Sequence, residues 1–415
     1  MHDLGELPVW SVLPFALVLL AIAILPLAAG HFWEHNRNKA LVTAALALPV
    51  AVWLGASHLE ALLHTGLEYV SFIALLGALY VIAGGIHLAG DLQGRPATNT
   101  LILALGAVLA NLVGTTGASM LIIRFLLRTN SQRKHRAHIP VFFILAVSNC
   151  GGLLTPLGDP PLFLGYLRGV PFAWTLSLWP FWLGVVGYLL AVFYVVDRRA
   201  YVRESAADLL RDIKEREELR VHGKRNVVLL GGVVAAVFAP TPWRELVMVG
   251  LAVASVTLTG KVGRAKNGFT WGPIFEVAIL FAGIFVTMVP ALALLQAHGG
   301  ELGLRLPWQY FLVTGALSSV LDNAPTYLTF LSAAQSLGLP AETGGVPDAY
   351  LAAISLGAVL MGANTYIGNG PNFMVKAIAD EAKYETPSFF GYAARATGIL
   401  LPAYLAITLY FVLAG

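Results

Sequence analysis

Two stretches of similar sequence interrupt the apolar parts of this chain. Residues 155–163 read TPLGDPPLF and residues 365–373 read TYIGNGPNF, so that Asp159 in the first stands against Asn369 in the second. Glycine and proline interrupt helices, and the freed backbone N–H and carbonyl groups can bind ions at membrane depth. The two stretches therefore predict a pair of broken helices that together line one ion or substrate site.

Asp159 and Asp322 are carboxylates inside apolar segments. Charge within a membrane is costly, so each is a candidate for function, as a ligand of Na⁺ (or Li⁺) or as a carrier of H⁺. Asp159 also fits a second interpretation, because Asp followed by Pro160 is a common helix start in which the aspartate caps the helix. Capping explains Asp322 less well, since no proline follows it directly.

Neutral oxygen atoms accompany the two carboxylates, and such hard ligands suit a monovalent cation. Asn149 could cap a helix or bind the ion, and Lys376 could be a counter-ion for the aspartates or a lysine that reaches toward the membrane edge. The predicted ion and substrate site comprises Asp159, Asp322, Asn323, Asn149, Thr155, Thr365, Asn369, Thr116, Thr326 and Lys376. Phosphate-binding loops, zinc-ligand spacings and nucleophile motifs do not occur, which predicts no enzymatic activity, no cofactor and no nucleic-acid partner.

Composition sets the fold class in which these residues must be placed. Of 415 residues, 57% are hydrophobic and only 12% are charged, which is typical of an integral membrane protein. The apolar segments are long enough for transmembrane helices and lack the alternation of a membrane barrel. We expect an all-α membrane protein with about ten transmembrane helices. The single cysteine, Cys150, excludes an internal disulfide.

Lysine and arginine are unevenly distributed among the polar segments. Residues 35–39, 128–136, 197–225 and 261–266 are basic, whereas residues 56–68 and 340–349 contain neither residue. Positive segments remain in the cytoplasm, so we expect a multi-pass protein of the inner (cytoplasmic) membrane with both termini external. The charged, helix-prone segment 197–225 is predicted to be a solvated amphipathic helix that links two halves.

The order of elements is the same in both halves, residues 1–196 and 226–415. An odd number of spans in each half inserts the second copy upside down, as in many secondary transporters. Each half has one stretch whose two ends need the same side of the membrane, which predicts a re-entrant hairpin. The hairpins are predicted at 98–127 and 308–336, and the broken helices at 138–168 and 349–380.

The motifs SNCGGLLTPLGDPPLF, SSVLDNAPTYLTF and GANTYIGNGPNF resemble the ion-transporter superfamily, which includes NhaD-type sodium/proton antiporters, arsenite permeases and divalent-anion/sodium symporters. The chain looks closest to its branch of sodium/proton antiporters and citrate transporters. The resemblance implies that residues 149–159 and 364–372 and both hairpin tips line the site, in a homodimer with elevator-like motion.

The resemblance leaves three functions open. The leading one is a Na⁺(Li⁺)/H⁺ antiporter, with Na⁺ and H⁺ as coupling ions. The alternatives are a Na⁺- or H⁺-coupled symporter of citrate or another dicarboxylate, and an arsenite-type efflux permease. Symporters of the superfamily carry Ser-Asn-Thr at both hairpin tips, whereas the tips here read LVGTTGAS and LDNAPTYL. Asp322 would repel a dicarboxylate unless it were protonated or held a cation.

Overall fold

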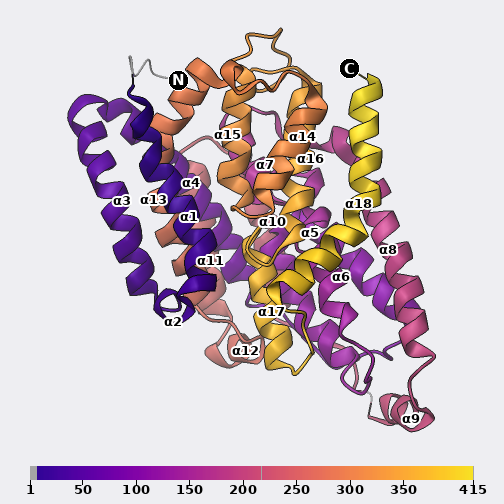
Figure 1. Ribbon diagram of the computed structural model, residues 1–415. Helices are drawn as coiled ribbons and strands as arrows, with labels where there is room; N and C mark the ends of the chain where they lie inside the picture. The colour runs from indigo at the N-terminus through magenta and orange to yellow at the C-terminus, as the bar shows by residue number, and fades with distance from the viewer. Residues whose placement is uncertain (1–6, 216, 415) are drawn as a thin grey trace.

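The computed structural model describes residues 7–215 and 217–414. It is an all-α membrane protein, as predicted (Figure 1). Within the described residues, seven helices are long and apolar enough to cross a membrane. The other predicted spans are shorter because the helices that carry them are broken or end early, as α10 (Lys224–Ala236) and α11 (Trp243–Leu258) do.

The first half begins with a group of helices that precede the hairpin. These are η1 (Val9–Val12), α1 (Leu13–Ala28), α2 (Gly30–Trp33), α3 (Asn36–Ser57) and α4 (Leu59–Ala83). The hairpin, the broken helix and the last span follow as α5 (Pro96–Thr129), α6 (His138–Ala146), η2 (Cys150–Leu154), α7 (Pro160–Leu167), η3 (Phe172–Leu178) and α8 (Trp179–Tyr201).

The second half follows a short helix, α9 (Ala206–Lys214). After α10 and α11 it contains α12 (Lys261–Lys266), α13 (Gly272–His298), η4 (Gly299–Leu302), α14 (Pro307–Ser318) and α15 (Asn323–Gln335). The second broken helix is α16 (Asp348–Met361), η5 (Gly362–Asn364) and α17 (Gly370–Glu381), and α18 (Phe389–Ala414) completes the chain.

α5 turns back on itself, which the hydrogen bonds at its two ends show. Asn99 near its start and Asn130 just after its end exchange two amide hydrogen bonds of 2.8 Å. The turn is at Gly114, where φ is 76° and ψ is 154°, a conformation that glycine adopts without a steric penalty. A buried ion pair between Arg133 and Asp197, 2.6 Å long, joins the open end of this hairpin to α8. In the second half, residues 319–322 connect α14 to α15 as the corresponding tip.

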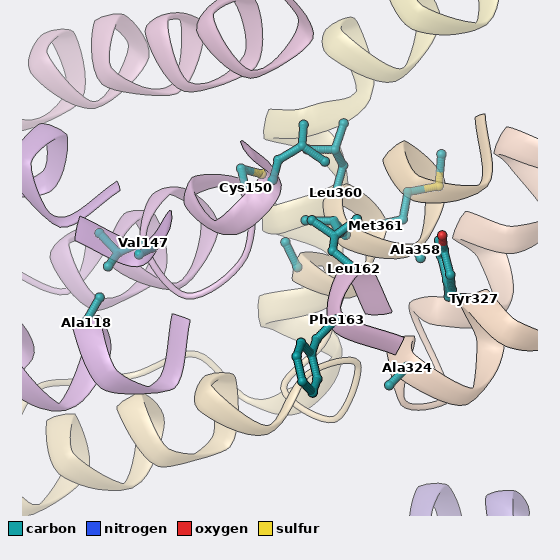
Figure 2. Packing of buried hydrophobic residues seen from close by; sticks show 14 of the residues in the cluster. Ala118, Val147, Cys150, Leu162, Phe163, Ala324, Tyr327, Ala358, Leu360 and Met361 are labelled. Atoms are coloured by element: carbon teal, nitrogen blue, oxygen red, sulfur yellow. The ribbon is translucent and has the colours of Figure 1, made fainter. Parts of the chain in front are cut away.

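The two helix breaks repeat the same close contacts. In the first, the Thr155 hydroxyl donates to the backbone carbonyl of Asn111 on α5. In the second, the Thr365 hydroxyl donates to the carbonyl of Ser319 beside α14, at 2.5 Å. Each break therefore binds the hairpin of its own half through one threonine. Figure 2 shows apolar residues around the breaks, including Cys150 of the first and Leu360 and Met361 of the second.

The segment after α8 differs from the predicted linker helix. Among the described residues between α8 and α10, the helical stretch is Ala206–Lys214. β2 (Arg220–His222) pairs antiparallel with β1 (His87–Ala89), with His222 opposite His87. Opposite-charge pairs on a helix contribute only a few tenths of a kcal/mol each. The backbone hydrogen bonds that β1 offers outweigh that preference at residues 220–222.

Figure 1 shows α2, α9 and α12 at one end of the bundle, and the beginning of α1 and the end of α18 at the other. The basic segments therefore gather at one end, as the charge distribution predicted.

Candidate functional site

Asp159 lies at the meeting point of both hairpins and both helix breaks. Its side chain is buried, with 1% of its surface exposed. One carboxylate oxygen accepts hydrogen bonds from the Thr115 hydroxyl at 2.8 Å and the Asn369 amide at 3.0 Å. The other accepts from the Asn323 amide at 2.6 Å. All three of these donors are neutral, so they solvate the carboxylate without cancelling its charge.

Asp159 occupies the N-cap position of α7, but its side chain caps nothing. A capping carboxylate takes the N–H of the second or third helical residue. Pro160 and Pro161 fill the first two positions of α7 and have no N–H to offer. The interpretation of Asp159 as a simple cap was wrong, because the second proline removes a donor that capping uses. Its carboxylate is left for the neighbouring elements.

Asp322 is the aspartate that caps a helix. Its side chain accepts from the backbone N–H of Ala324 at 3.0 Å at the start of α15. The expectation that capping would explain Asp322 less well than Asp159 is therefore reversed. Asp322 is half-buried and directly precedes Asn323, so it stands beside the site while one of its oxygens serves the helix.

Asparagine side chains connect the two helix breaks to each other. The Asn369 amide, besides Asp159, donates to Asn149 Oδ1 at 3.2 Å. Asn149 in turn donates to Asn372 Oδ1 at 2.6 Å, and Asn372 donates to the carbonyls of Gly362 and Thr365. The Asn149 side chain therefore makes no capping hydrogen bond, and its recorded hydrogen bonds with Asn372 and Asn369 hold the second break against the first. Buried amides arranged in this way fix the geometry around the carboxylate.

Asn323 carries an unpaired polar atom in this site. The residue is fully buried, and while its amide nitrogen donates to Asp159, its Oδ1 has no hydrogen-bond partner. A buried carbonyl oxygen without a partner costs free energy, on the order of 1–3 kcal/mol. An oxygen of this kind beside a carboxylate is suited to a cation ligand.

The predicted threonines are divided among different tasks. Thr155 and Thr365 bind the hairpins, and the Thr326 hydroxyl bonds back to the carbonyl of Asp322 at 2.8 Å. Thr116 is half-buried and lies beside a small cavity of 50 Å³ at the tip of α5. It is Thr115, one residue earlier, that contacts Asp159. A sequence offers two adjacent hydroxyls at a tip, and only the turn at Gly114 decides which one faces the carboxylate.

Lys376 lies on α17 and is paired within its own helix. Its ammonium bonds to Asp380, one turn later, and stands 5.5 Å from the centre of the Tyr366 ring. The recorded ion-pair partner of Lys376 is therefore Asp380, and not Asp159 or Asp322 as the counter-ion interpretation expected. Sequence reasoning also gave no place to Asn111, whose side-chain oxygen accepts from the backbone of Leu154 at 2.8 Å. Its position three residues before a predicted hairpin tip was the feature of the sequence that could have identified Asn111.

Residues near the start of α4 and the ends of α13 and α15 line a cavity of 520 Å³. It is lined by α4, α7, α13 and α15, including Leu328 and Ser332 of α15. Leu328 is five residues from Asn323, about 7.5 Å along the helix. Glu68 of α4 and Arg168 after α7 both line the cavity and form an ion pair with an N–O distance of 2.7 Å.

Within the described part of the chain, no group of three or more histidines, cysteines or acidic residues could hold a metal ion. A cation at Asp159 would therefore depend on few carboxylates and on neutral oxygens, which suits a monovalent ion rather than a divalent one.

Residues 4–412 match the family described as "Putative citrate transport". The chain belongs to this citrate transport family. An uncharacterized transporter of Mycobacterium tuberculosis and one of Mycobacterium bovis are each 25% identical over 414 residues, which covers 91% of this chain and 95% of each relative. A 46 kDa membrane protein of Mycobacterium leprae is 25% identical over 381 residues, 84% of this chain and 87% of its own. This member of the citrate transport family is thus a multi-pass transporter, similar over nearly its whole length to proteins named as transporters.

Proposed function

We propose that this transporter exchanges a monovalent cation, Na⁺ or Li⁺, for protons at Asp159. The observation that carries the proposal is the environment of this carboxylate: it is buried, and its three recorded hydrogen-bond donors are neutral.

A buried carboxylate is costly even when it is hydrogen-bonded, and neutralising its charge lowers that cost. A protein cation is the usual solution, but Asp159 receives amide and hydroxyl hydrogens instead. Two solutions remain, protonation of the carboxylate or binding of a small cation. They exclude one another at a single site, so that loading one ion releases the other. Mutual exclusion of this kind couples the two fluxes when the loaded site is exposed to each side of the membrane in turn.

The neighbours of Asp159 can serve both states. When the carboxylate is charged and without a cation, Thr115, Asn323 and Asn369 donate to it. A hydroxyl oxygen also accepts, and an amide presents its oxygen after rotation. Asn323 Oδ1 is already unpaired. These oxygens, with the carboxylate, would supply the hard ligands that Na⁺ prefers.

The two cavities beside the hairpins are unequal, which suits alternating access. The 520 Å³ cavity along α15 approaches the site from one end of the molecule, whereas the cavity at the tip of α5 holds only 50 Å³. If the larger cavity closed and the smaller one opened, Asp159 would be exposed to the opposite side. We propose that the hairpins and broken helices move as one body against the remaining spans, in a homodimer of the inner membrane.

The family description favours a second candidate, a Na⁺- or H⁺-coupled citrate symporter. In that case a cation at Asp159 would help to hold the anion, and backbone N–H groups at the starts of α7 and α17 would bind a carboxylate.

Proteoliposomes with an internal pH dye distinguish the two functions when challenged separately with Na⁺, Li⁺, K⁺ and citrate. The antiporter predicts a proton flux that Na⁺ or Li⁺ evokes without citrate. Uptake of labelled citrate that needs Na⁺ or a proton gradient, with no Na⁺-evoked proton flux in the absence of citrate, would overturn it in favour of the symporter.

A further inference from the structure

A groove of 740 Å³ lies between α6, α8 and α18, and it shares no lining residue with the cavities of 520 Å³ and 50 Å³. Its floor is apolar and includes Val141 and Phe142 of α6 and Ile399 of α18. Along α8 it is lined by Tyr188, Val192, Val196 and Ala200, which recur every four residues and so form one stripe.

The groove is as long as one leaflet of a membrane is deep. Ala200 lies twelve residues after Tyr188, which is about 18 Å at 1.5 Å per residue, and half of a hydrocarbon core is about 15 Å. Exposed apolar side chains flank it, with 47% of Val195 and 47% of Leu401 accessible. α8 and α18 both belong to apolar segments long enough to cross a membrane, so the groove between them has the length and the lining to receive an acyl chain.

Basic residues border the groove at the end near α9. Lys134 and Arg136 precede α6, and Arg395 lies on the second turn of α18. Lys134 is 75% exposed and stands 3.6 Å from Asp208, whose pKa is lowered mainly by the Ser205 hydroxyl and further by this lysine. Arg136 lies over the Tyr384 ring at 4.1 Å.

Among the lysine, arginine and acidic residues that line the groove, Lys134, Arg136 and Arg395 outnumber the acidic residue. Glu385 is the acidic residue among those that line the groove. The described structure records no ion pair for Arg395, and its side chain is exposed. His138, on the same rim, contacts Asp197 at 2.8 Å. A phosphate group placed here would meet Lys134, Arg136 and Arg395.

We propose that this groove binds an anionic phospholipid of the leaflet on the α9 side. Its phosphate lies among Lys134, Arg136 and Arg395, and one acyl chain follows the stripe on α8. Basic pockets between transmembrane helices are suited to such headgroups. The proposal does not depend on which ion or anion the protein transports.

Two pairs of variants test the headgroup and the floor separately. Lys134→Ala with Arg395→Ala removes two charges of the rim, and Arg225→Ala is a matched control because Arg225 is an exposed arginine in the first turn of α10 at the same end. Gly398→Leu fills the groove, since a Cβ on Gly398 would meet no atom within 4 Å. Gly250→Leu on α11 is its control, with equally open surroundings.

The measurement is lipid retention on the detergent-purified full-length protein, by native mass spectrometry, with phosphatidylglycerol, phosphatidylcholine of the same chains, or inorganic phosphate. Each basic side chain is expected to contribute about a fivefold preference for the anionic lipid. The double variant should lose most of that preference, Gly398→Leu should lose both lipids, and the controls should match the unaltered protein. Equal retention of the two lipids, or a double variant that behaves like the unaltered protein, would overturn the proposal. Retention of inorganic phosphate without lipid would also overturn it. So would a dimer that dissociates in Gly398→Leu, because a second copy of the chain would then occupy the groove.

Discussion

Asp159 and Asp322 both stand directly before a helix, and the residues that follow give their side chains different tasks. Asp322 is followed by Asn323 and Ala324, and it takes the N–H of Ala324. Asp159 is followed by two prolines and turns instead to Thr115, Asn323 and Asn369. Proline at the second helical position thus leaves the carboxylate free to bond to neighbouring elements without moving it from the helix terminus.

Asp159→Asn is expected to abolish cation-evoked proton flux, because asparagine keeps the size and some hydrogen bonds but cannot titrate. Asp322→Asn is expected to retain most of the flux, since asparagine caps a helix about as well as aspartate. Flux in proteoliposomes is the measurement, and equal amounts of monodisperse protein control for folding. Normal flux in Asp159→Asn would remove this carboxylate from the mechanism, and loss in Asp322→Asn alone would assign the coupling to Asp322.

At the scale of the secondary-structure elements, glycines allow the backbone within each helix break to pack closely against itself. A Cβ added to Gly158 would lie 2.0 Å from the carbonyl oxygen of Gly152, and one added to Gly368 would lie 2.5 Å from that of Gly362. Each break therefore folds back on itself six residues later, in the same way in both halves. Such a turn has room only for glycine at positions 158 and 368, because a Cβ there would overlap the backbone.

Gly158→Ala is expected to lower stability by about 1–3 kcal/mol or more, as overpacking of a tight site does. Gly370→Ala serves as the control, because a Cβ on Gly370 meets nothing within 4 Å although it also lies at a helix break. Apparent melting temperature in detergent, followed by gel filtration after heating, should fall for the first variant and remain unchanged for the second. An unchanged melting temperature for Gly158→Ala would show that the break is not packed as described.

The sequence predicts the elements of this protein better than the roles of single residues within them. Hydropathy and glycine or proline place the breaks and the turn at Gly114, because these depend on local chain chemistry. The partners of Asp159 come from positions 115, 323 and 369, and no local pattern shows that these meet. The strand at Arg220–His222 was missed for the same reason, since its partner lies at His87–Ala89.

At the scale of the whole molecule, the two ends of the bundle differ in charge and in accessibility. The helices α9 and α12 belong to basic segments and α2 directly precedes one, and all three share one end of the bundle (Figure 1). The 520 Å³ cavity is lined by residues near the start of α4 and the ends of α13 and α15, toward the other end. Basic segments remain on the cytoplasmic side. If the basic end is cytoplasmic, as this rule predicts, the larger cavity lies toward the external end of the molecule.

This orientation predicts opposite labelling of two single cysteines. Leu210 on α9 is 56% exposed, and Ala341 lies exposed in the segment before α16. The native Cys150 is fully buried and is replaced in a Cys150→Ser background. An impermeant thiol reagent added to intact cells should label Ala341→Cys but not Leu210→Cys, and both should react after the membrane is permeabilised. Labelling of position 210 from outside would invert the orientation. The 520 Å³ cavity would then lie toward the cytoplasmic end of the molecule.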